Sequence, residues 1–321
     1  MLQSHTYGIH FINANFERRL KPLNMPSYSP EDLSTKERHQ ILLASVAPRP
    51  IALVSTVDEF GNHNLSPFSF FNIFSSNPPV LIFSAARRVR NNTTKDTLHN
   101  AMSQKEVVVN VVNYDMAQQV NLSSAEYDSS VDEFVKSGLT PIPSDLVSPP
   151  RVLESPVSLE CEVMNVHQLG EEGGAGNLVM CLVKKIHVTD HVILDDGSID
   201  QEAIDLVGRL GKKWWVRASG DALFELGSPA IGIGVDQIPE VIRRSTVLTG
   251  NNLGQLGAVT SLPSIAAIEA MKSDFDVRRI LQNFSDGIEL REALHEKAKE
   301  LLELEKVVEA WSILLIDKSA Q

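Results

Sequence analysis

The chain has 321 residues, of which 43% are hydrophobic and 22% are charged, as in a globular protein of one large domain or two smaller ones. Its 41 acidic and 29 basic residues give a formal net charge of −12. This balance argues against nucleic acid or an anionic membrane as the main partner, because binding to phosphate polymers needs clustered Lys and Arg. No apolar run approaches the ~20 residues that span a bilayer, and the first residues lack the pattern of a secretory signal. We therefore expect a cytoplasmic protein.

Residues 1–37 predict a polar arm, because Pro22, Pro26 and Pro30 prevent a continuous helix. From about residue 38 to 220, short apolar and β-branched runs alternate with turn signals. The expected strands are 49–57, 65–74, 79–84, 107–112, 157–169 and 178–189, with two short helices at 95–105 and 116–125. The long amphipathic helices that a doubly wound α/β fold needs between its strands are missing. The fold class predicted for this domain is therefore mainly β, as an antiparallel barrel that is closed or nearly closed.

Residues 221–321 are predicted to form a C-terminal extension, loop-rich up to 285 and with a helix at about 286–316. The helix would carry one apolar stripe with 3–4–3–4 spacing, formed by Leu301, Leu304, Val308, Trp311 and Leu315. The stripe is too short for a free coiled coil, so we expect it to pack onto the body or across a dimer.

Only two cysteines are available for a disulfide, Cys161 and Cys181. They lie in the expected strands 157–169 and 178–189. If Leu169 pairs with Leu178, the cysteines are about five rungs apart, which is about 16 Å along the ladder. A disulfide tolerates at most ~7 Å between Cα atoms, so we predict two buried free thiols.

Several nucleotide and metal patterns are incomplete. The glycines of 173–176 are not followed by a helix and predict a hairpin loop, and residues 208–213 lack the spacing and the Ser/Thr of a phosphate-binding loop. A calcium-loop pattern would need Glu where the chain has Leu206. His187 and His191 would be about 13 Å apart on a strand. We therefore expect no metal site.

A cationic turn follows the expected strand that ends at Ser84. Four cations fall within nine residues: Arg87, Arg88, Arg90 and Lys95. Residues 92–94 are all good N-cap types and mark the start of the next helix. A helix N-terminus offers unpaired N–H groups and a positive dipole, so cations beside it predict a small anion site. The alternative is a solvated basic loop paired with surface carboxylates.

A second segment, residues 64–72, mixes three phenylalanines with two serines and two asparagines. This mixture suits a flat polar heterocycle with a phosphate tail, because the ring needs apolar surface and its carbonyls need hydrogen-bond donors. The alternative is that the phenylalanines are core residues. Alternation along one strand would place Phe68 and Phe70 on the same face.

In order and spacing, these pieces resemble the flavin reductase-like proteins of the FMN-binding split-barrel fold, in the flavoredoxin subgroup. The resemblance covers roughly residues 38–220 and runs through 49–56, 66–72, 77–79, 95–97, 109–111, Asn121, 132–140 and 207–211. It implies a split β-barrel of antiparallel, Greek-key type, a homodimer, and FMN bound near the dimer interface.

The resemblance also implies the site residues. Residues 66–72 would lie along the isoalloxazine and ribityl chain, the Arg/Lys-Asp-Thr region would hold the phosphate, and Trp214 would form an aromatic wall. The cofactor-binding residues expected on this basis are Thr56, Pro67, Phe68, Ser69, Phe70, Phe71, Asn72, Ser84, Arg87, Arg88, Lys95, Asp96, Thr97 and Trp214. No catalytic side chain is expected, because the chemistry takes place at the flavin N5.

The chain departs from the family after Gly208-Arg-Leu, where relatives usually read Gly-Gly-Asn-Tyr-Tyr and this chain has Gly211-Lys-Lys-Trp-Trp. Tryptophan keeps an aromatic wall but removes the phenolic hydroxyls. The N-terminal arm and residues 221–321 exceed the minimal domain, and either could cover the flavin.

Three functions remain open. The first is an oxidoreductase in which NAD(P)H, docking transiently, reduces FMN by hydride transfer and the electrons pass to a small-molecule or protein acceptor. The second is an FMN-carrying electron-transfer protein with little NAD(P)H activity. The third is a module that uses the barrel for another ligand.

Overall fold

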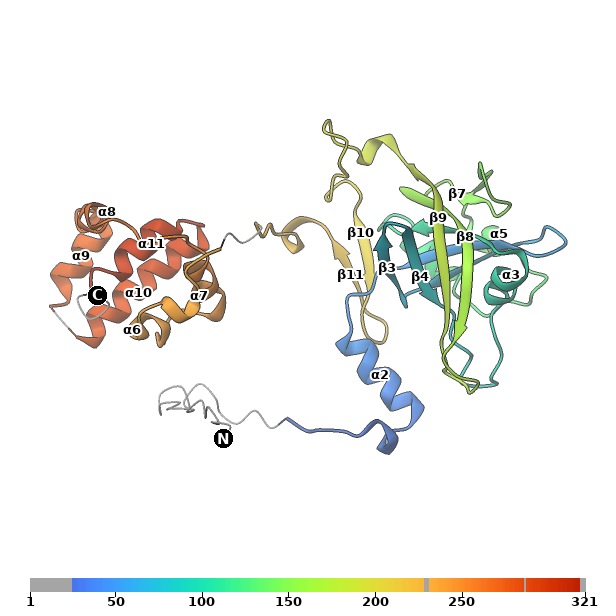
Figure 1. Cartoon of the computed structure of the whole chain (residues 1–321), viewed down its shortest axis with the longest axis horizontal. Helices are drawn as coiled ribbons and strands as arrows, with labels where there is room; N and C mark the ends of the chain where they lie inside the picture. Colours follow the sequence, from blue (N-terminus) through green and yellow to red (C-terminus); the bar gives the residue numbers. More distant parts are fainter. Residues whose placement is uncertain (1–24, 228–230, 286, 318–321) are drawn as a thin grey trace, which may run out of the picture. The chain divides into compact units, whose positions relative to one another are not determined.

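The computed structural model describes residues 25–227, 231–285 and 287–317, so most of the predicted N-terminal arm lies outside the described residues. The chain divides into two compact units (Figure 1). The first spans Ser27–Phe224, and the second contains the chain from Glu225 onward. In the part that the structure describes, no helix has the length and apolar character needed to cross a bilayer.

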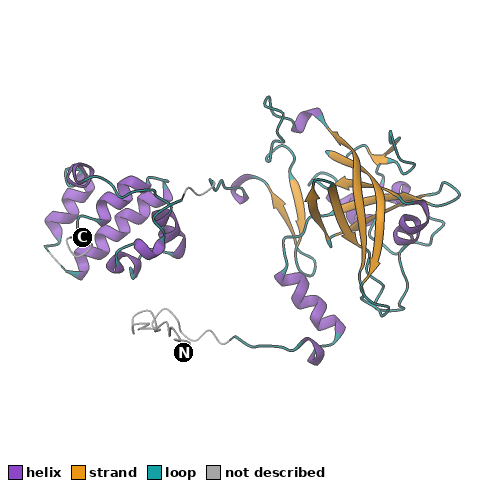
Figure 2. Cartoon of the chain, viewed as in Figure 1, coloured by secondary structure: helices purple, strands orange, loops and turns teal. Residues whose placement is uncertain are grey.

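The first unit is built on one seven-stranded sheet with the order β2-β1-β5-β8-β9-β4-β3, in which every pairing is antiparallel (Figure 2). Its strands are β1 (Ala52–Val57), β2 (His63–Phe68), β3 (Phe71–Ser76), β4 (Pro79–Ser84), β5 (Glu106–Val111), β8 (Val157–Gln168) and β9 (Asn177–Val188). Two small ribbons complete it: β6 (Pro141–Ile142) with β7 (Arg151–Val152), and β10 (Leu206–Arg209) with β11 (Trp215–Ala218). The predicted mainly β, antiparallel architecture is confirmed.

The prediction of one strand over 65–74 is wrong, because the chain changes partner in the middle of it. β2 pairs with β1 at one edge of the sheet, and β3 pairs with β4 at the other edge. Only Ser69 and Phe70 separate the two strands. Such a connection reaches only about 11 Å, so the two edges of the sheet must come together. This corner therefore closes the sheet into a barrel.

Both faces of β1 are buried, since its residues alternate between two apolar cores. Ala52 and Val54 join the core that includes Val107, Val109 and both cysteines. Leu53 joins a second core under α4 and α5. The helices of this unit are η1 (Pro30–Asp32), α2 (Thr35–Ser45), α3 (Asp96–Gln104), α4 (Ala117–Leu122), α5 (Glu133–Ser137), η2 (Asp190–Val192) and η3 (Gly220–Ala222).

The predicted cysteine register is wrong, although the thiols are free and buried as expected. Cys161 pairs with Val183, and Cys181 pairs with Val163. The cysteines are thus offset by two residues, because the ladder shifts at two irregularities that the sequence does not signal. Burial, with a smaller contribution from the charge of Glu160, raises the pKa of Cys161 to about 12, so this thiol is inert at neutral pH.

The second unit is helical and has its own core. Its helices are η4 (Val235–Gln237), α6 (Glu240–Arg243), α7 (Gly250–Gly257), α8 (Ile265–Met271), α9 (Phe275–Asn283), α10 (Ile288–Glu303) and α11 (Val307–Leu314). The prediction that residues up to 285 are loop-rich is therefore wrong. Thr249, Ser264 and Asp274 cap three of these short helices with their side chains. The core includes Trp311, whose indole N–H donates to the Leu256 carbonyl at 2.9 Å.

The predicted single helix at about 286–316 is also wrong. The chain breaks between α10 and α11, where Glu305 takes the left-handed conformation with φ of 60°. Leu304 and Val308 are 64% and 57% exposed, whereas Trp311 is buried. The 3–4–3–4 stripe is therefore not one continuous buried face, because the helix ends before Glu305 and an exposed member of the stripe lies on each side of it.

Candidate functional site

The cationic turn between β4 and α3 is folded on itself by its own arginines. Arg87 donates through Nε and Nη2 to the side-chain oxygen and the carbonyl of Asn92, at 2.6 and 2.8 Å. Arg88 donates through Nη1 to the Thr93 hydroxyl at 2.9 Å and to the Thr94 carbonyl at 2.7 Å. Arg90 is exposed and pairs with Glu126 at 2.8 Å. Arg87 and Arg88 thus hold the shape of the turn, and the Glu126 carboxylate pairs with Arg90 and, at 3.7 Å, with Arg88.

The glycine-rich loop between β8 and β9 supports this turn from behind. The Arg87 N–H donates to the Ala175 carbonyl at 2.8 Å, and the Gly174 N–H donates to the Arg87 carbonyl at 2.9 Å. A Cβ placed on Gly173 would lie 3.0 Å from the Cα of Val89, so a larger residue would push the loop off the turn. The expectation of a hairpin loop is confirmed, and its glycines permit this close approach.

Lys95 is the fourth cation, and it turns inward. Its Nζ donates to the Ser66 hydroxyl at 2.7 Å and lies 4.9 Å from the centroid of the Phe68 ring. Burial, and then the charge of Arg88, lowers the pKa of Lys95. Two acidic side chains oppose that shift but do not reverse it. A partly buried ammonium whose pKa is lowered in this way is stabilised by an anion next to it.

The start of α3 adds donors to the same place. Lys95 is the N-cap residue, and no side chain caps the helix. Its first backbone N–H groups are therefore free of a side-chain acceptor, and the positive end of the helix dipole lies beside Lys95. Asp96 is exposed, and Thr97 is buried with its hydroxyl accepting a hydrogen bond from Asn64 Nδ2 at 2.9 Å.

Thr56 lies in the layer beneath this site. It is completely buried, and its hydroxyl oxygen accepts hydrogen bonds from Asn64 Nδ2 at 3.0 Å and Asn100 Nδ2 at 3.1 Å. Asn64 and Asn100 link β1 and β2 to α3 in this way. The network holds the helix start in position relative to Ser66.

The aromatic segment divides at the corner between β2 and β3. Phe68 is buried, with its ring centroid 5.0 Å from that of Phe83, and Phe71 packs against the same core. Phe70 is 41% exposed. The expectation that Phe68 and Phe70 share a face is wrong, because the strand ends between them. The corner therefore presents Ser69, Phe70 and the exposed Asn72.

Arg49 is a residue that the sequence reasoning missed. Its guanidinium is buried and donates to the carbonyls of Leu43, Val46 and Leu210 at 2.6, 2.8 and 3.1 Å, while its Nε lies 3.5 Å from the Ser69 hydroxyl. Burial, and then the charge of Arg209, lowers the pKa of Arg49. An arginine followed by proline at the start of an apolar strand was the available signal.

The remaining expected residues are less closely grouped. Ser84 is buried at the end of β4. Trp214 is 72% exposed, while its neighbour Trp215 lines a cavity of about 210 Å³ together with Pro67 and Ser69. Of the two tryptophans in the Gly211-Lys-Lys-Trp-Trp segment, Trp215 is therefore the one that lines this cavity.

Asn177 offers an unused acceptor near the cationic turn. Its Nδ2 donates to the Ala85 carbonyl at 2.7 Å, whereas its buried Oδ1 has no hydrogen-bond partner within the described residues. A buried acceptor in this state is suited to a donor from a bound group.

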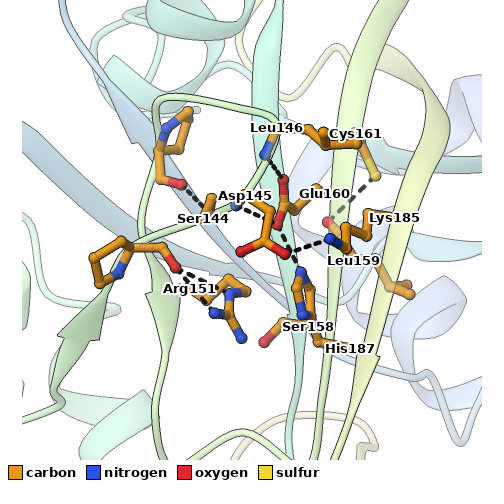
Figure 3. A network of polar contacts seen from close by, with 12 residues as sticks. Ser144, Asp145, Leu146, Arg151, Ser158, Leu159, Glu160, Cys161, Lys185 and His187 are labelled. Atoms are coloured by element: carbon orange, nitrogen blue, oxygen red, sulfur yellow. Dashed lines mark hydrogen bonds and ion pairs between the residues drawn. The ribbon is translucent and has the colours of Figure 1, made fainter.

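A separate polar network lies on the outer face of β8 and β9 (Figure 3). The fully buried Glu160 carboxylate accepts hydrogen bonds from the N–H groups of Asp145 and Leu146 at 2.8 and 2.6 Å, and it pairs with His187 Nε2 at 2.6 Å. Lys185 forms an ion pair with Asp145. Burial alone would raise the pKa of Glu160, but these hydrogen bonds outweigh it and lower the pKa. The network fastens the segment that contains Asp145 to the sheet.

Comparison with known proteins shows the family to which the first unit belongs. The model of the flavin reductase-like domain matches residues 44–198. An uncharacterized protein of Halalkalibacterium halodurans is 39% identical over 184 residues, which are 57% of this chain and 87% of that protein. The chain belongs to the flavin reductase-like family. An uncharacterized protein of Aquifex aeolicus is 36% identical over 57% of this chain and 91% of its own length.

Solved structures agree with this membership. Nitrilotriacetate monooxygenase component B from Bacillus cereus is 31% identical, with a TM-score of 0.59 over 63% of this chain and 98% of that one. A protein of Shewanella frigidimarina that has been assigned as a flavin reductase with a split-barrel domain is 28% identical, with a TM-score of 0.54 over 64% of this chain and all of that one. This flavin reductase-like chain therefore has the split-barrel fold of a flavin-binding family, and the helical unit lies beyond the matched domain.

Proposed function

We propose that the chain is an FMN-binding oxidoreductase that accepts hydride from NAD(P)H and passes electrons to a small-molecule or protein acceptor. One observation carries the proposal: a partly buried ammonium, Lys95, lies at a helix start without a side-chain cap, between the Ser66 hydroxyl and the Phe68 ring. Together these groups present a charge, N–H donors and an apolar surface within one small volume.

The phosphate of FMN is assigned to the start of α3. A phosphate monoester carries about −1.5 to −2 charges. Lys95 supplies one positive charge, and the nearby Arg88, whose Nε also lies 3.7 Å from a Glu126 carboxylate oxygen, supplies part of a second. Arg87 and Arg88 hold the turn in shape before the phosphate arrives, so little conformational entropy is lost on binding.

The flavin ring is assigned to the corner at Ser69 and Phe70. When bound, FMN supplies hydride acceptance at its N5 atom. The chain supplies orientation there: Arg49 Nε reaches the Ser69 hydroxyl, and Trp215 walls the adjoining cavity. The Asn177 Oδ1 atom, which has no hydrogen-bond partner within the described residues, is consistent with a bound flavin, because the flavin has N–H and O–H groups that can donate to it.

We also propose a cytoplasmic homodimer. Ile73 and Phe74 on the edge strand β3 are 65% and 63% exposed. Neighbouring apolar side chains that are exposed on one strand are suited to burial against a second copy. The free thiols of Cys161 and Cys181 agree with a reducing compartment.

Anaerobic titration of the FMN-loaded full chain tests the function. Loss of the flavin absorbance at roughly 450 nm on addition of NADPH or NADH, followed by its return with an added electron acceptor, is the expected result. Tight FMN binding without reduction by either nucleotide would leave the electron-carrier alternative. A chain that takes up no FMN would contradict both.

A further inference from the structure

A second cationic region of the first unit is not used by the flavin assignment. A cavity of about 620 Å³ lies between α4 and the β10–β11 ribbon. Its lining includes Tyr114, Arg209, Lys212, Lys213 and Trp215. We call this cavity the basic groove. Its volume lies within the range that holds a ligand of nucleotide size.

The charges of the basic groove are not balanced by the chain. Among the described residues, no carboxylate forms an ion pair with Arg209, Lys212 or Lys213, whereas the neighbouring Arg217 pairs with Asp205 at 2.7 Å. A chain with a net charge of −12 offers many carboxylates. Three cations left without one therefore give the groove a local positive potential, which attracts an anionic ligand.

Two aromatic rings lie under the arginines of the groove. The Arg209 guanidinium lies 5.0 Å from the Trp215 ring, and that of Arg217 lies 4.0 Å from the Tyr114 ring. The ring contact restrains the Arg209 guanidinium, whose Nη2 donates to the Lys212 carbonyl at 3.1 Å and whose other N–H groups remain for a ligand. The Arg217 guanidinium is already occupied by Asp205. Planar cations beside lysines suit phosphate together with a flat heterocycle.

The basic groove continues toward the proposed flavin corner. The smaller cavity that contains Pro67 and Ser69 shares three lining residues with it, Asn121, Arg209 and Trp215. A ligand with its anionic end at Lys212 can therefore extend along Arg209 and Trp215 toward Ser69. An elongated dinucleotide has this shape, with an anionic adenosine half and a nicotinamide half.

Lys212 has an unusual backbone conformation at the groove. Its φ is 56°, in the left-handed region that favours glycine. The chain thus accepts backbone strain at the position that places one of the two exposed lysines at the mouth of the groove. Two lysines side by side suit a phosphate dianion better than a single negative charge.

We propose that the basic groove binds the adenosine half of the hydride donor, and that Lys212 and Lys213 recognise a 2′-phosphate and so select NADPH over NADH. This inference rests on the proposed function for the identity of the donor. The binding step itself involves only the groove and can be measured without hydride transfer.

Calorimetric titration of the FMN-loaded full chain with adenosine 2′,5′-bisphosphate and with adenosine 5′-monophosphate tests the inference. The bisphosphate is expected to bind about ten-fold more tightly, and this preference is expected to shrink as KCl rises from about 50 to 500 mM, because exposed charges are screened. The double variant Lys212→Gly/Lys213→Gln is expected to lose the preference while keeping FMN. Glycine suits the left-handed position, so loss of folding is not the expected cause.

Lys184→Gln is the matched control, because Lys184 is an exposed lysine of the same unit that pairs with Glu162; its preference should match that of the unchanged chain. Equal binding of the two nucleotides, no binding of either, or an unchanged preference in the double variant would overturn the inference.

Reduction kinetics with NADPH and NADH then separate the two proposals. A nucleotide preference without flavin reduction contradicts the proposed function alone, whereas flavin reduction without a nucleotide preference contradicts the groove alone.

Discussion

The two cationic regions of the barrel unit differ in how their charges are held. At the turn before α3, Arg87 and Arg88 are hydrogen-bonded to their own turn, and Lys95 is partly buried against Ser66 and Phe68. In the basic groove, Lys212 and Lys213 are exposed and form no ion pair with any described carboxylate. A buried, pre-organised charge suits a ligand that stays bound, and an open one suits a ligand that exchanges. The first region therefore fits a resident cofactor and the second a transient substrate.

Removing the buried charge should give the largest effect. Lys95→Met is expected to weaken FMN binding by about 100-fold, because a desolvated charge-assisted hydrogen bond is among the stronger contacts a phosphate can make. Quenching of flavin fluorescence measures the affinity. Lys184→Met, which removes an exposed charge paired with Glu162, should change it less than about two-fold. Equal losses of FMN affinity in Lys95→Met and Lys184→Met would show that Lys95 contributes no more than an exposed surface lysine.

The pH dependence of FMN binding should follow the same lysine. Burial, and then Arg88, lowers the pKa of Lys95. Its ammonium, which attracts the phosphate, is present below that pKa and is lost as the pH rises through it. FMN affinity should therefore fall as the pH rises through the lowered pKa of Lys95, before the pH at which an ordinary lysine loses its proton. In Lys95→Arg, titrated over the same range, the affinity should stay level because a guanidinium remains charged. A parallel fall in that variant would assign the titration to another group.

Loosening the turn without removing a charge should have a smaller effect. Asn92→Ala deletes the acceptor of Arg87 Nε and the donor to the Glu171 carbonyl, and Asn92 has a φ of 55° that alanine tolerates poorly. We expect about a five-fold loss of FMN affinity by the same fluorescence titration. Arg90→Gln is the comparison within the turn, since Arg90 contacts Glu126 on the surface. An effect of Arg90→Gln as large as that of Asn92→Ala would show that the turn acts only through its net charge.

The smallest effect concerns strain in the basic groove. Lys212→Gly should raise the free energy of unfolding of the barrel unit by up to about 1 kcal/mol, because glycine adopts a φ of 56° without a Cβ clash. The larger conformational entropy that glycine loses on folding reduces this gain. Urea unfolding followed by tryptophan fluorescence measures this. A clear loss of stability would show that the lysine side chain is structural and would weaken its assignment to a ligand.

Local signals in the sequence were enough for part of the site. The cations of residues 87–95 and the polar residues at the start of α3 lie next to one another in the chain, so their proximity in the fold follows directly. The contact between Lys95 and the Ser66 hydroxyl is an addition from the structure. These contacts depend on one turn and one neighbouring strand.

What the sequence did not reveal depends on long-range geometry. The corner at Ser69 exists because the two sheet edges meet, and the cysteine register depends on bulges within the β8–β9 ladder. Arg49 takes one of its partners, the Leu210 carbonyl, from the β10–β11 turn, which is distant in the chain. The helices of 240–283 were missed because short amphipathic segments look like loops until a shared core, here around Trp311, buries one face of each.

Titration of the unchanged full chain with FMN and, separately, with riboflavin tests the central claim most directly, since the two flavins differ only by the 5′-phosphate. If the buried lysine and the helix start hold that phosphate, FMN should bind about 100-fold more tightly than riboflavin. Equal affinities for the two flavins would contradict the account, because the cationic turn would then contribute nothing to cofactor binding.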